Sequence, residues 1–238
     1  MRIAITGATG FVGGRLAERL VLQGKDEVVG LVRRFSGPGL ARLARLPVSM
    51  AQADLTDVEQ LRQAFAGCGV VVHCAYGTSG TPEERFATTV DGTSAVLEAA
   101  AVEGVQRVVH ISSTAVHGIP RNGTIDESTP FASPQTPYDR MKQEAENVLW
   151  AYHRQTGFPV TVLRPPLIYG PNGRRWTTAI IGEILAGATL VEDGRGVANF
   201  VHVDNLVDAI RVCMTSESAA GEAFVAVDDD PATWAQVY

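Results

Sequence analysis

The stretch TGATGFVGG, residues 6–14, directly follows the apolar run Ile3–Ile5 near the beginning of the chain. Its glycines Gly7, Gly10 and Gly13 are spaced one residue wider than the G-x-G-x-x-G pattern of dinucleotide-binding sites. In a strand–loop–helix unit, one glycine permits the tight turn, another lets a pyrophosphate approach the backbone, and a third allows close helix packing. Free N–H groups at the helix start then face the anion. The stretch predicts such a unit, with a glycine-rich turn that holds no ligand as the alternative.

Short β-branched runs alternate with helical stretches along most of the chain. Strands that are apolar throughout and are separated by crossover helices indicate a parallel sheet covered on both faces. We therefore expect an α/β fold with a doubly wound parallel Rossmann sheet, and a loop over 118–137. The expected strands are 2–6, 27–32, 48–52, 69–73, 107–112, 160–164 and 223–227, and the expected helices lie near 11–22, 56–66, 83–103 and 137–155.

The alternation breaks between Pro165 and about Val203, where we expect a cap over the strand ends. We expect a dinucleotide-binding domain over 1–164, with 204–230 packing back onto it, and a small substrate-binding region over 165–203 and 231–238. The last residues read as a strand, a turn and a helix that Thr233 caps, and the chain stops within the first turns of that helix. The substrate-binding region is therefore expected to be incomplete.

Composition narrows the class of protein and its partners. The 238 residues carry a formal net charge of -6, which argues against nucleic-acid and anionic-membrane partners. No apolar stretch reaches the length of a membrane span. The 3 cysteines are an odd number without metal-ligand spacing, so we expect reduced thiols, a cytoplasmic protein and no metal site.

The end of the second expected strand indicates which dinucleotide is bound. An acid at this place meets the ribose of NAD, whereas an arginine accommodates the 2′-phosphate of NADP. Here Arg33 and Arg34 follow the strand, with no carboxylate. Because arginine binds phosphate in a bidentate manner, we favour NADP(H) over NAD(H), which stays possible. A solvated basic turn is the alternative reading.

A second group of polar residues lies further along the chain. Tyr138 and Lys142 are four residues apart, so they share one face of a helix that Thr136 is expected to cap. Ser113 follows the expected strand 107–112, where ligands meet the carboxyl edge of a parallel sheet. The neighbouring Ser112 is expected to support the turn.

Together these motifs resemble the short-chain dehydrogenase/reductase family in its extended, epimerase/dehydratase-like form. The resemblance covers essentially the whole chain. Besides TGATGFVGG it rests on Asp54-Leu55, HCA at 73–75, DGT at 91–93, SSTAVHG at 112–118, YDRMK at 138–142, LRPPLIYGP at 163–171 and FVHVDNLVDAI at 200–210.

The resemblance implies an NAD(P)-dependent oxidoreductase that acts on a small-molecule carbonyl or alcohol substrate, with Ser113, Tyr138 and Lys142 as its catalytic group. It also implies that Asp54 meets the adenine amine, that Ala75 lies along the cofactor, and that Lys142 binds the nicotinamide ribose. A homodimer through the helices near 83–103 and 137–155 is expected as well. The other residues placed at the cofactor are Thr9, Phe11, Val12, Leu55, Cys74, Tyr138, Pro165 and Leu167.

Chemistry supports these roles independently. A tyrosine with an ordinary pKa of about 10 is a poor base near neutral pH. A nearby ammonium and the cationic nicotinamide both favour the phenolate, and lowering the pKa to about 7 requires roughly 4 kcal/mol. We therefore expect Lys142 to lower the pKa of Tyr138. The Ser113 hydroxyl would stabilise charge on the substrate oxygen.

Some positions depart from the family pattern. Dehydratases carry carboxylates where this chain has Thr114 and Ala115, which argues against dehydration. Nucleotide-sugar epimerases place an arginine where this chain has Ala198, although Arg174, Arg175 or Arg195 could substitute. His117 and Thr89 also depart from the residues usual at their positions. The alternatives to a reductase are a nucleotide-sugar epimerase with the same Tyr/Lys chemistry and a non-catalytic NADP-binding redox sensor.

Overall fold

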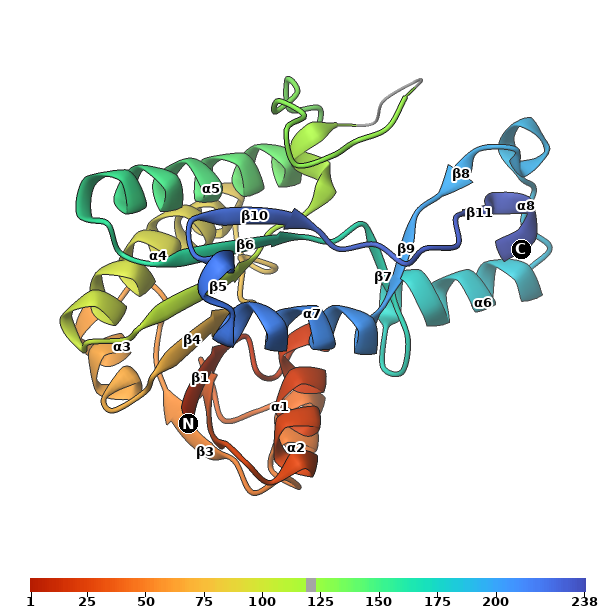
Figure 1. Cartoon of the computed structure of the whole chain (residues 1–238). Helices are drawn as coiled ribbons and strands as arrows, with labels where there is room; N and C mark the ends of the chain where they lie inside the picture. Colours follow the sequence, from red (N-terminus) through yellow and green to blue (C-terminus); the bar gives the residue numbers. More distant parts are fainter. Residues whose placement is uncertain (119–122) are drawn as a thin grey trace.

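A computed structural model of the chain describes residues 1–118 and 123–238. Figure 1 shows a twisted sheet with helices on both faces and a smaller lobe that projects from it. The sheet has seven strands in the order β10-β6-β5-β4-β1-β2-β3, and every neighbouring pair is parallel. The strands are β1 (Arg2–Thr6), β2 (Glu27–Val32), β3 (Ser49–Gln52), β4 (Val70–His73), β5 (Arg107–Ile111), β6 (Val160–Arg164) and β10 (Glu222–Val225).

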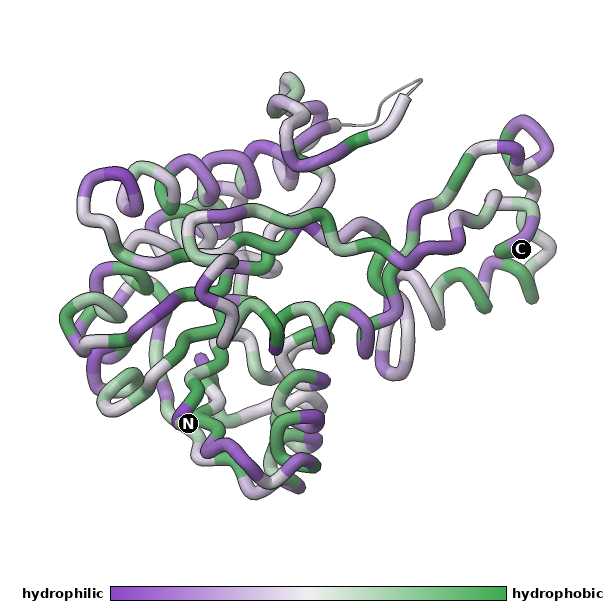
Figure 2. The backbone as a smooth tube through the Cα atoms, viewed as in Figure 1, coloured by the Kyte–Doolittle hydropathy of each residue, from purple (hydrophilic) through white to green (hydrophobic). Residues whose placement is uncertain are grey.

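Helices cover both faces of this sheet (Figure 1). One face packs against α3, α4 and α5, and the other packs against α1, α2 and α7. Hydrophobic stretches run through the sheet between the two layers (Figure 2), because the strands are buried on both sides. The helices are α1 (Phe11–Gln23), α2 (Pro38–Leu43), α3 (Val58–Phe65), α4 (Pro82–Val102), α5 (Pro137–Thr156) and α7 (Val203–Thr215).

The expected doubly wound parallel sheet is confirmed. All expected strands and helices are present, with their ends displaced by at most two residues. The sequence analysis missed α2 and α7. Helix α2 has only six residues in a Gly/Pro-containing stretch, which is too short for a helical period to be recognised. The expected loop over 118–137 includes residues 119–122, which lie outside the described residues.

Helix α5 begins where its capping residues predict. The Thr136 side chain accepts a hydrogen bond from the Asp139 N–H, and the Asp139 carboxylate accepts one from the Thr136 N–H. This capping box, with Pro137 at the first helical position, fixes the start of the helix that carries Tyr138 and Lys142.

The lobe consists of residues 165–203 and 231–238. It projects beyond the carboxyl end of the sheet (Figure 1), the end at which we expected a cap. Two two-stranded sheets, β7–β9 and β11–β8, hold it together. Its elements are β7 (Leu167–Tyr169), α6 (Ala179–Leu185), β8 (Val197–Ala198), β9 (Phe200–His202), β11 (Ala232–Thr233) and α8 (Trp234–Val237), with short helical turns η2 (Arg174–Thr178) and η3 (Val191–Gly194).

After the lobe the chain returns to the sheet through α7 and β10. Helix α7 lies against α1, where the Arg15 guanidinium donates to the Asp204 carboxylate at 2.6 Å. A short turn η4 (Glu217–Ala219) then leads into β10, which pairs with β6. The Thr233 side chain takes part in a capping box with Gln236 at the start of α8, as its position predicts.

Candidate active site

The order of the strands places a crevice between β1 and β4. The chain leaves β1 toward β2 on one side, while β4 pairs with β1 on the other side. In doubly wound sheets, ligands bind at this switch point, outside the carboxyl ends of the strands. The glycine-rich loop follows β1 and residues Cys74–Ala75 follow β4, so both lie at this crevice.

The glycine-rich loop needs its glycines for close approach of backbone atoms. Gly7 has φ +69, and a Cβ atom there would lie 2.9 Å from the Ala75 nitrogen. A Cβ atom at Gly13 would lie 2.4 Å from the Gly7 oxygen. Gly10 is the N-cap of α1 and provides no side-chain acceptor, so the first N–H groups of the helix stay available to an anion. The loop therefore keeps N–H donors available to an anion, and its role as a pyrophosphate site stays a prediction.

A pocket of about 500 Å³ lies at the carboxyl edge of the sheet and contains three of the predicted residues. Arg33 and Arg34 enter it from the end of β2, and Asp54 enters it from the loop after β3. Asp54 accepts hydrogen bonds from the N–H and the hydroxyl of Thr56, and these bonds hold the pKa of its carboxyl below the ordinary value. Asp54 is therefore a carboxylate at neutral pH.

The predicted catalytic residues come from two elements that meet at the carboxyl edge. Ser113 follows β5 and caps the short turn η1 (Thr114–His117), accepting a hydrogen bond from the Ala115 N–H at 3.2 Å. Tyr138 lies in the first turn of α5, which begins at the same edge of the sheet. The Lys142 ammonium is buried and donates to the Ile111 carbonyl at 2.8 Å.

The expected effect of Lys142 on Tyr138 is not seen. Burial raises the pKa of Tyr138 to about 12, where we expected a lowered value. Lys142 points to the end of β5 instead, and burial lowers its own pKa to about 8. Spacing on a helix face brings the two side chains near each other, but burial and the Ile111 carbonyl decide where the ammonium lies.

Sequence analysis missed Tyr76, which touches both of these side chains. Its ring centroid lies 5.0 Å from the Lys142 Nζ and 5.8 Å from the Tyr138 ring, in an edge-on arrangement. Tyr76 comes from the loop after β4. Its aromatic character within the motif HCAY was the only available signal, because the contact depends on how α5 packs.

A buried layer of polar groups lies beneath the catalytic residues. Glu146 pairs with Arg164 at 2.7 Å, with side chains 0% and 7% exposed. Glu146 also accepts a hydrogen bond from the Ser112 hydroxyl, which supports the strand end just before Ser113. Glu146 is therefore the partner of Ser112 in its expected supporting role. The sequence analysis did not identify Glu146, which lies four residues after Lys142 on the same helix.

The remaining predicted cofactor residues line the same edge or pack beneath it. Thr9, Phe11 and Val12 are partly buried in the loop and in the first turn of α1. Cys74 and Ala75 follow β4, and the Ala75 N–H donates to the Thr6 hydroxyl. The Pro165 carbonyl accepts from the Thr114 N–H, and Leu167 begins β7. Leu55 packs against Gly92 of α4.

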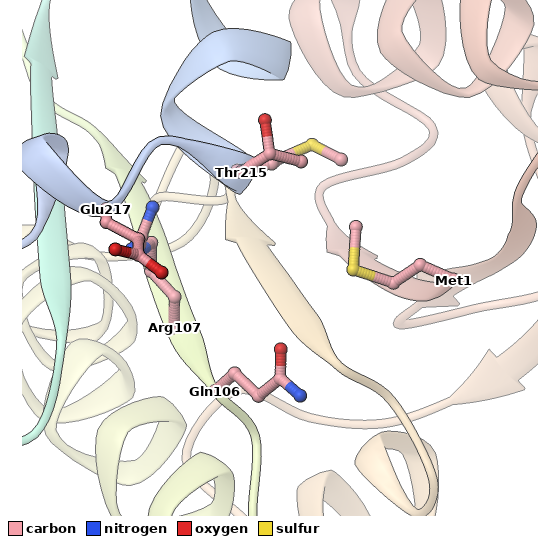
Figure 3. A pocket seen from close by; sticks show the side chains of 6 residues that line it. Met1, Gln106, Arg107, Thr215 and Glu217 are labelled. Atoms are coloured by element: carbon pink, nitrogen blue, oxygen red, sulfur yellow. The ribbon is translucent and has the colours of Figure 1, made fainter.

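A second pocket, of about 330 Å³, lies at the opposite, amino edge of the sheet (Figure 3). Its Arg107 side chain donates to the Cys213 carbonyl at the end of α7, so this arginine is part of the framework. In the described ranges 1–118 and 123–238, we find no group of three His, Cys, Asp or Glu side chains arranged to hold a metal ion. None of the helices in this part of the chain is long and apolar enough to cross a membrane.

Comparison with known proteins agrees with this geometry. The model of the NAD dependent epimerase/dehydratase family matches residues 3–226. The chain is 30% identical to the 2-alkyl-3-oxoalkanoate reductase of Shewanella oneidensis, over 98% of this chain and 63% of the reductase. It is 36% identical to sterol demethylase protein B of Methylococcus capsulatus, over 94% of this chain and 69% of that protein. The chain thus spans about two thirds of the length of these relatives.

A solved structure shows the same likeness. The dTDP-glucose 4,6-dehydratase DesIV of Streptomyces venezuelae, whose crystal structure has NAD bound, superimposes with a TM-score of 0.87 at 28% sequence identity. The match covers 100% of this chain and 79% of the dehydratase chain. The resemblance drawn from the sequence motifs is confirmed, and so is the prediction of an enzyme of this family.

Proposed function

The chain belongs to the NAD dependent epimerase/dehydratase family, and from this premise we propose that it transfers a hydride between NADP(H) and a carbonyl or alcohol substrate. Ser113, Tyr138 and Lys142 are its catalytic residues in this proposal. The observation that carries it is that the Tyr138 ring and the buried Lys142 ammonium both contact the Tyr76 ring at the carboxyl edge of the sheet, where Ser113 follows the neighbouring strand β5. Residues 165–203 and 231–238 are the proposed substrate-binding region.

The proton chemistry follows from the protonation states of the site. With a pKa of about 12, Tyr138 is protonated at neutral pH and serves as a proton donor to a carbonyl oxygen. Charge that develops on this oxygen is stabilised by the Ser113 hydroxyl, whose own oxygen accepts from the Ala115 N–H. The Lys142 ammonium, held by the Ile111 carbonyl beneath the site, would bind the nicotinamide ribose, as the family resemblance implies.

The glycine-rich loop, Arg33, Arg34 and Asp54 are the proposed cofactor site. A nicotinamide cofactor, when bound, supplies or accepts the hydride. The pyrophosphate would lie against the N–H groups at the start of α1, and the arginines would face the ribose 2′-phosphate. Asp54 is held near Thr56 and would face the adenine amine, as the family resemblance implies.

A reductase suits the lobe better than a nucleotide-sugar epimerase. Ala198, at the position of the epimerase arginine, is 2% exposed and pairs with Ala232 in the β11–β8 sheet. Of the three candidate substitutes, Arg175 lies over the Trp176 ring and Arg195 pairs with Asp193. Thr114 and Ala115 form part of η1 and offer no carboxylate for dehydration.

A substrate screen tests the proposal. Carbonyl compounds and nucleotide sugars are each offered with NADPH and with NADH, while the reduced cofactor and the sugar configuration are both followed. A reductase consumes reduced cofactor with a carbonyl substrate, whereas an epimerase changes the sugar without net consumption. Binding of NADPH without any turnover would instead support the redox sensor. We expect consumption of NADPH, and selective loss of NADPH use in Arg33→Ala/Arg34→Ala.

A further inference from the structure

The pocket that contains Arg33 and Arg34 is closed on its far side by the loop before α4. This loop contributes Ser79 and Gly80 to the lining, and the first turns of α4 contribute Glu84, Ala87 and Thr88. Arg33, on the opposite wall of the lining, contacts this loop, and its Nη2 donates to the Ser79 hydroxyl at 3.1 Å. Two segments that are 46 residues apart in the sequence thus meet over one pocket.

The loop that carries Ser79 is anchored at both ends. Gly77 is buried, and its N–H donates to the Thr89 hydroxyl at 3.0 Å. A Cβ atom at Gly77 would lie 2.3 Å from the Arg85 carbonyl oxygen, so the loop lies directly on α4. At the other end, Thr81 and Glu84 form a capping box. The contacts at both ends of the loop therefore hold Ser79 at the pocket.

The two carboxylates of the pocket are hydrogen-bonded to other groups, so the donors of Arg33 and Ser79 stay available to an anion. The Glu84 carboxylate accepts from the Thr81 N–H at 2.7 Å, and the Asp54 carboxylate accepts from Thr56. The Ser79 oxygen accepts from Arg33, so its O–H proton can be donated to another oxygen. The remaining N–H groups of the Arg33 guanidinium can be donated to the same acceptor.

We propose that Ser79 and Arg33 act together as donors to the ribose 2′-phosphate of NADP(H), so that Ser79 helps to determine cofactor specificity. The inference rests on the NADP(H) preference in the proposed function and adds a residue from the β4–α4 loop to it. A phosphate monoester carries three oxygens that accept charge-assisted hydrogen bonds. The ribose hydroxyl of NAD(H) carries no charge, and it gains less from the same two donors.

The direct test compares cofactor affinities of Ser79→Ala and the wild-type protein. Calorimetric titration is carried out with NADPH and NADH, and with adenosine 2′,5′-bisphosphate and adenosine 5′-monophosphate as fragments that differ by the 2′-phosphate. A hydrogen bond to a charged group contributes about 1.5 kcal/mol, so we expect roughly tenfold weaker binding of NADPH and of the bisphosphate. NADH and the monophosphate should change by less than about twofold. Ser79→Thr, which keeps the hydroxyl, should retain the preference.

Matched controls separate this inference from the proposed function. Thr88→Val removes another hydroxyl that lines the pocket and should leave the ratio of the two affinities unchanged. If Arg33→Ala weakens NADPH selectively but Ser79→Ala does not, the inference about Ser79 is wrong and the NADP(H) preference stands. If the wild-type protein binds both cofactors equally, both ideas are wrong. An equal loss of all four ligands in Ser79→Ala would likewise overturn the specificity role.

Discussion

The sheet and the lobe bury their apolar side chains to very different extents. All five residues of β6 are buried, whereas Ile180 is the only buried residue of α6. Leu185 and Val191 in the lobe are 83% and 84% exposed. Regions with few buried contacts open at low free energy, and they are the regions in which binding sites adapt. The sheet therefore holds the residues of the proposed proton chemistry rigidly, whereas the proposed substrate-binding lobe can adapt.

The strongest test of this contrast uses two ion pairs. Glu146–Arg164 is buried beneath the catalytic residues, while Asp193–Arg195 in the lobe has side chains 90% and 81% exposed. Breaking a buried pair leaves an uncompensated charge, so Glu146→Gln should lower the free energy of unfolding by about 3–5 kcal/mol. Asp193→Asn should change it by less than about 0.5 kcal/mol. Urea unfolding of both variants measures the two effects, and equal effects would contradict the contrast.

Two leucines give a second, purely apolar test. Leu163 in β6 is 1% exposed, and Leu185 in α6 is 83% exposed. Leu163→Ala removes buried methyl groups and leaves a cavity, so we expect a loss of about 2–5 kcal/mol in the free energy of unfolding. Leu185→Ala should stay within about 0.5 kcal/mol of the wild type. A large loss in Leu185→Ala would show that the lobe is packed as tightly as the sheet.

Burial of the charged Lys142 side chain lowers the stability of the folded protein. Its pKa in the folded protein is about 8, below the ordinary 10.5, so folding disfavours its protonated form. Below about pH 8 Lys142 is protonated in both the folded and the unfolded protein, so the full loss of folding free energy is present. As the pH rises from about 8 to 10.5, the folded protein releases the proton first, and this loss of stability disappears.

We therefore expect Lys142→Met to raise the free energy of unfolding at pH 7 by about 1–3 kcal/mol. The difference from the wild type should shrink as the pH rises through the same range. Urea unfolding at several pH values measures it. A gain that stays constant with pH would show that the charge of Lys142 does not limit stability.

The same contrast explains what the sequence could predict. Strands such as β1 and β6 match their expected ranges, because a short apolar run between turn residues can form few structures other than a buried strand. The lobe gave no regular period, because its short elements bury little. Motif spacing and strand ends predicted Ser113, Tyr138 and Lys142 as candidate residues. Tyr76 and Ser79 were missed, because a loop residue enters a site through packing of segments far apart in the chain.

The pKa of Tyr138 is a second property that depends on packing and could not be predicted from the sequence. Spacing on α5 predicted that Tyr138 and Lys142 would lie near each other. It could not show that the ammonium donates to the Ile111 carbonyl, or that burial raises the phenol pKa to about 12. Both depend on how deeply α5 is seated against the sheet.

The central claim is that Tyr138 donates the proton in hydride transfer at the carboxyl edge of the sheet. Single-turnover reduction of a carbonyl substrate from the screen, with NADPH bound to wild type and to Tyr138→Phe, tests it most directly. The substitution removes one hydroxyl and keeps the ring, so cofactor affinity should change by less than about twofold. The rate of hydride transfer should fall by about 10²–10⁴, as expected for a lost general acid. Turnover of Tyr138→Phe at the wild-type rate would contradict the account.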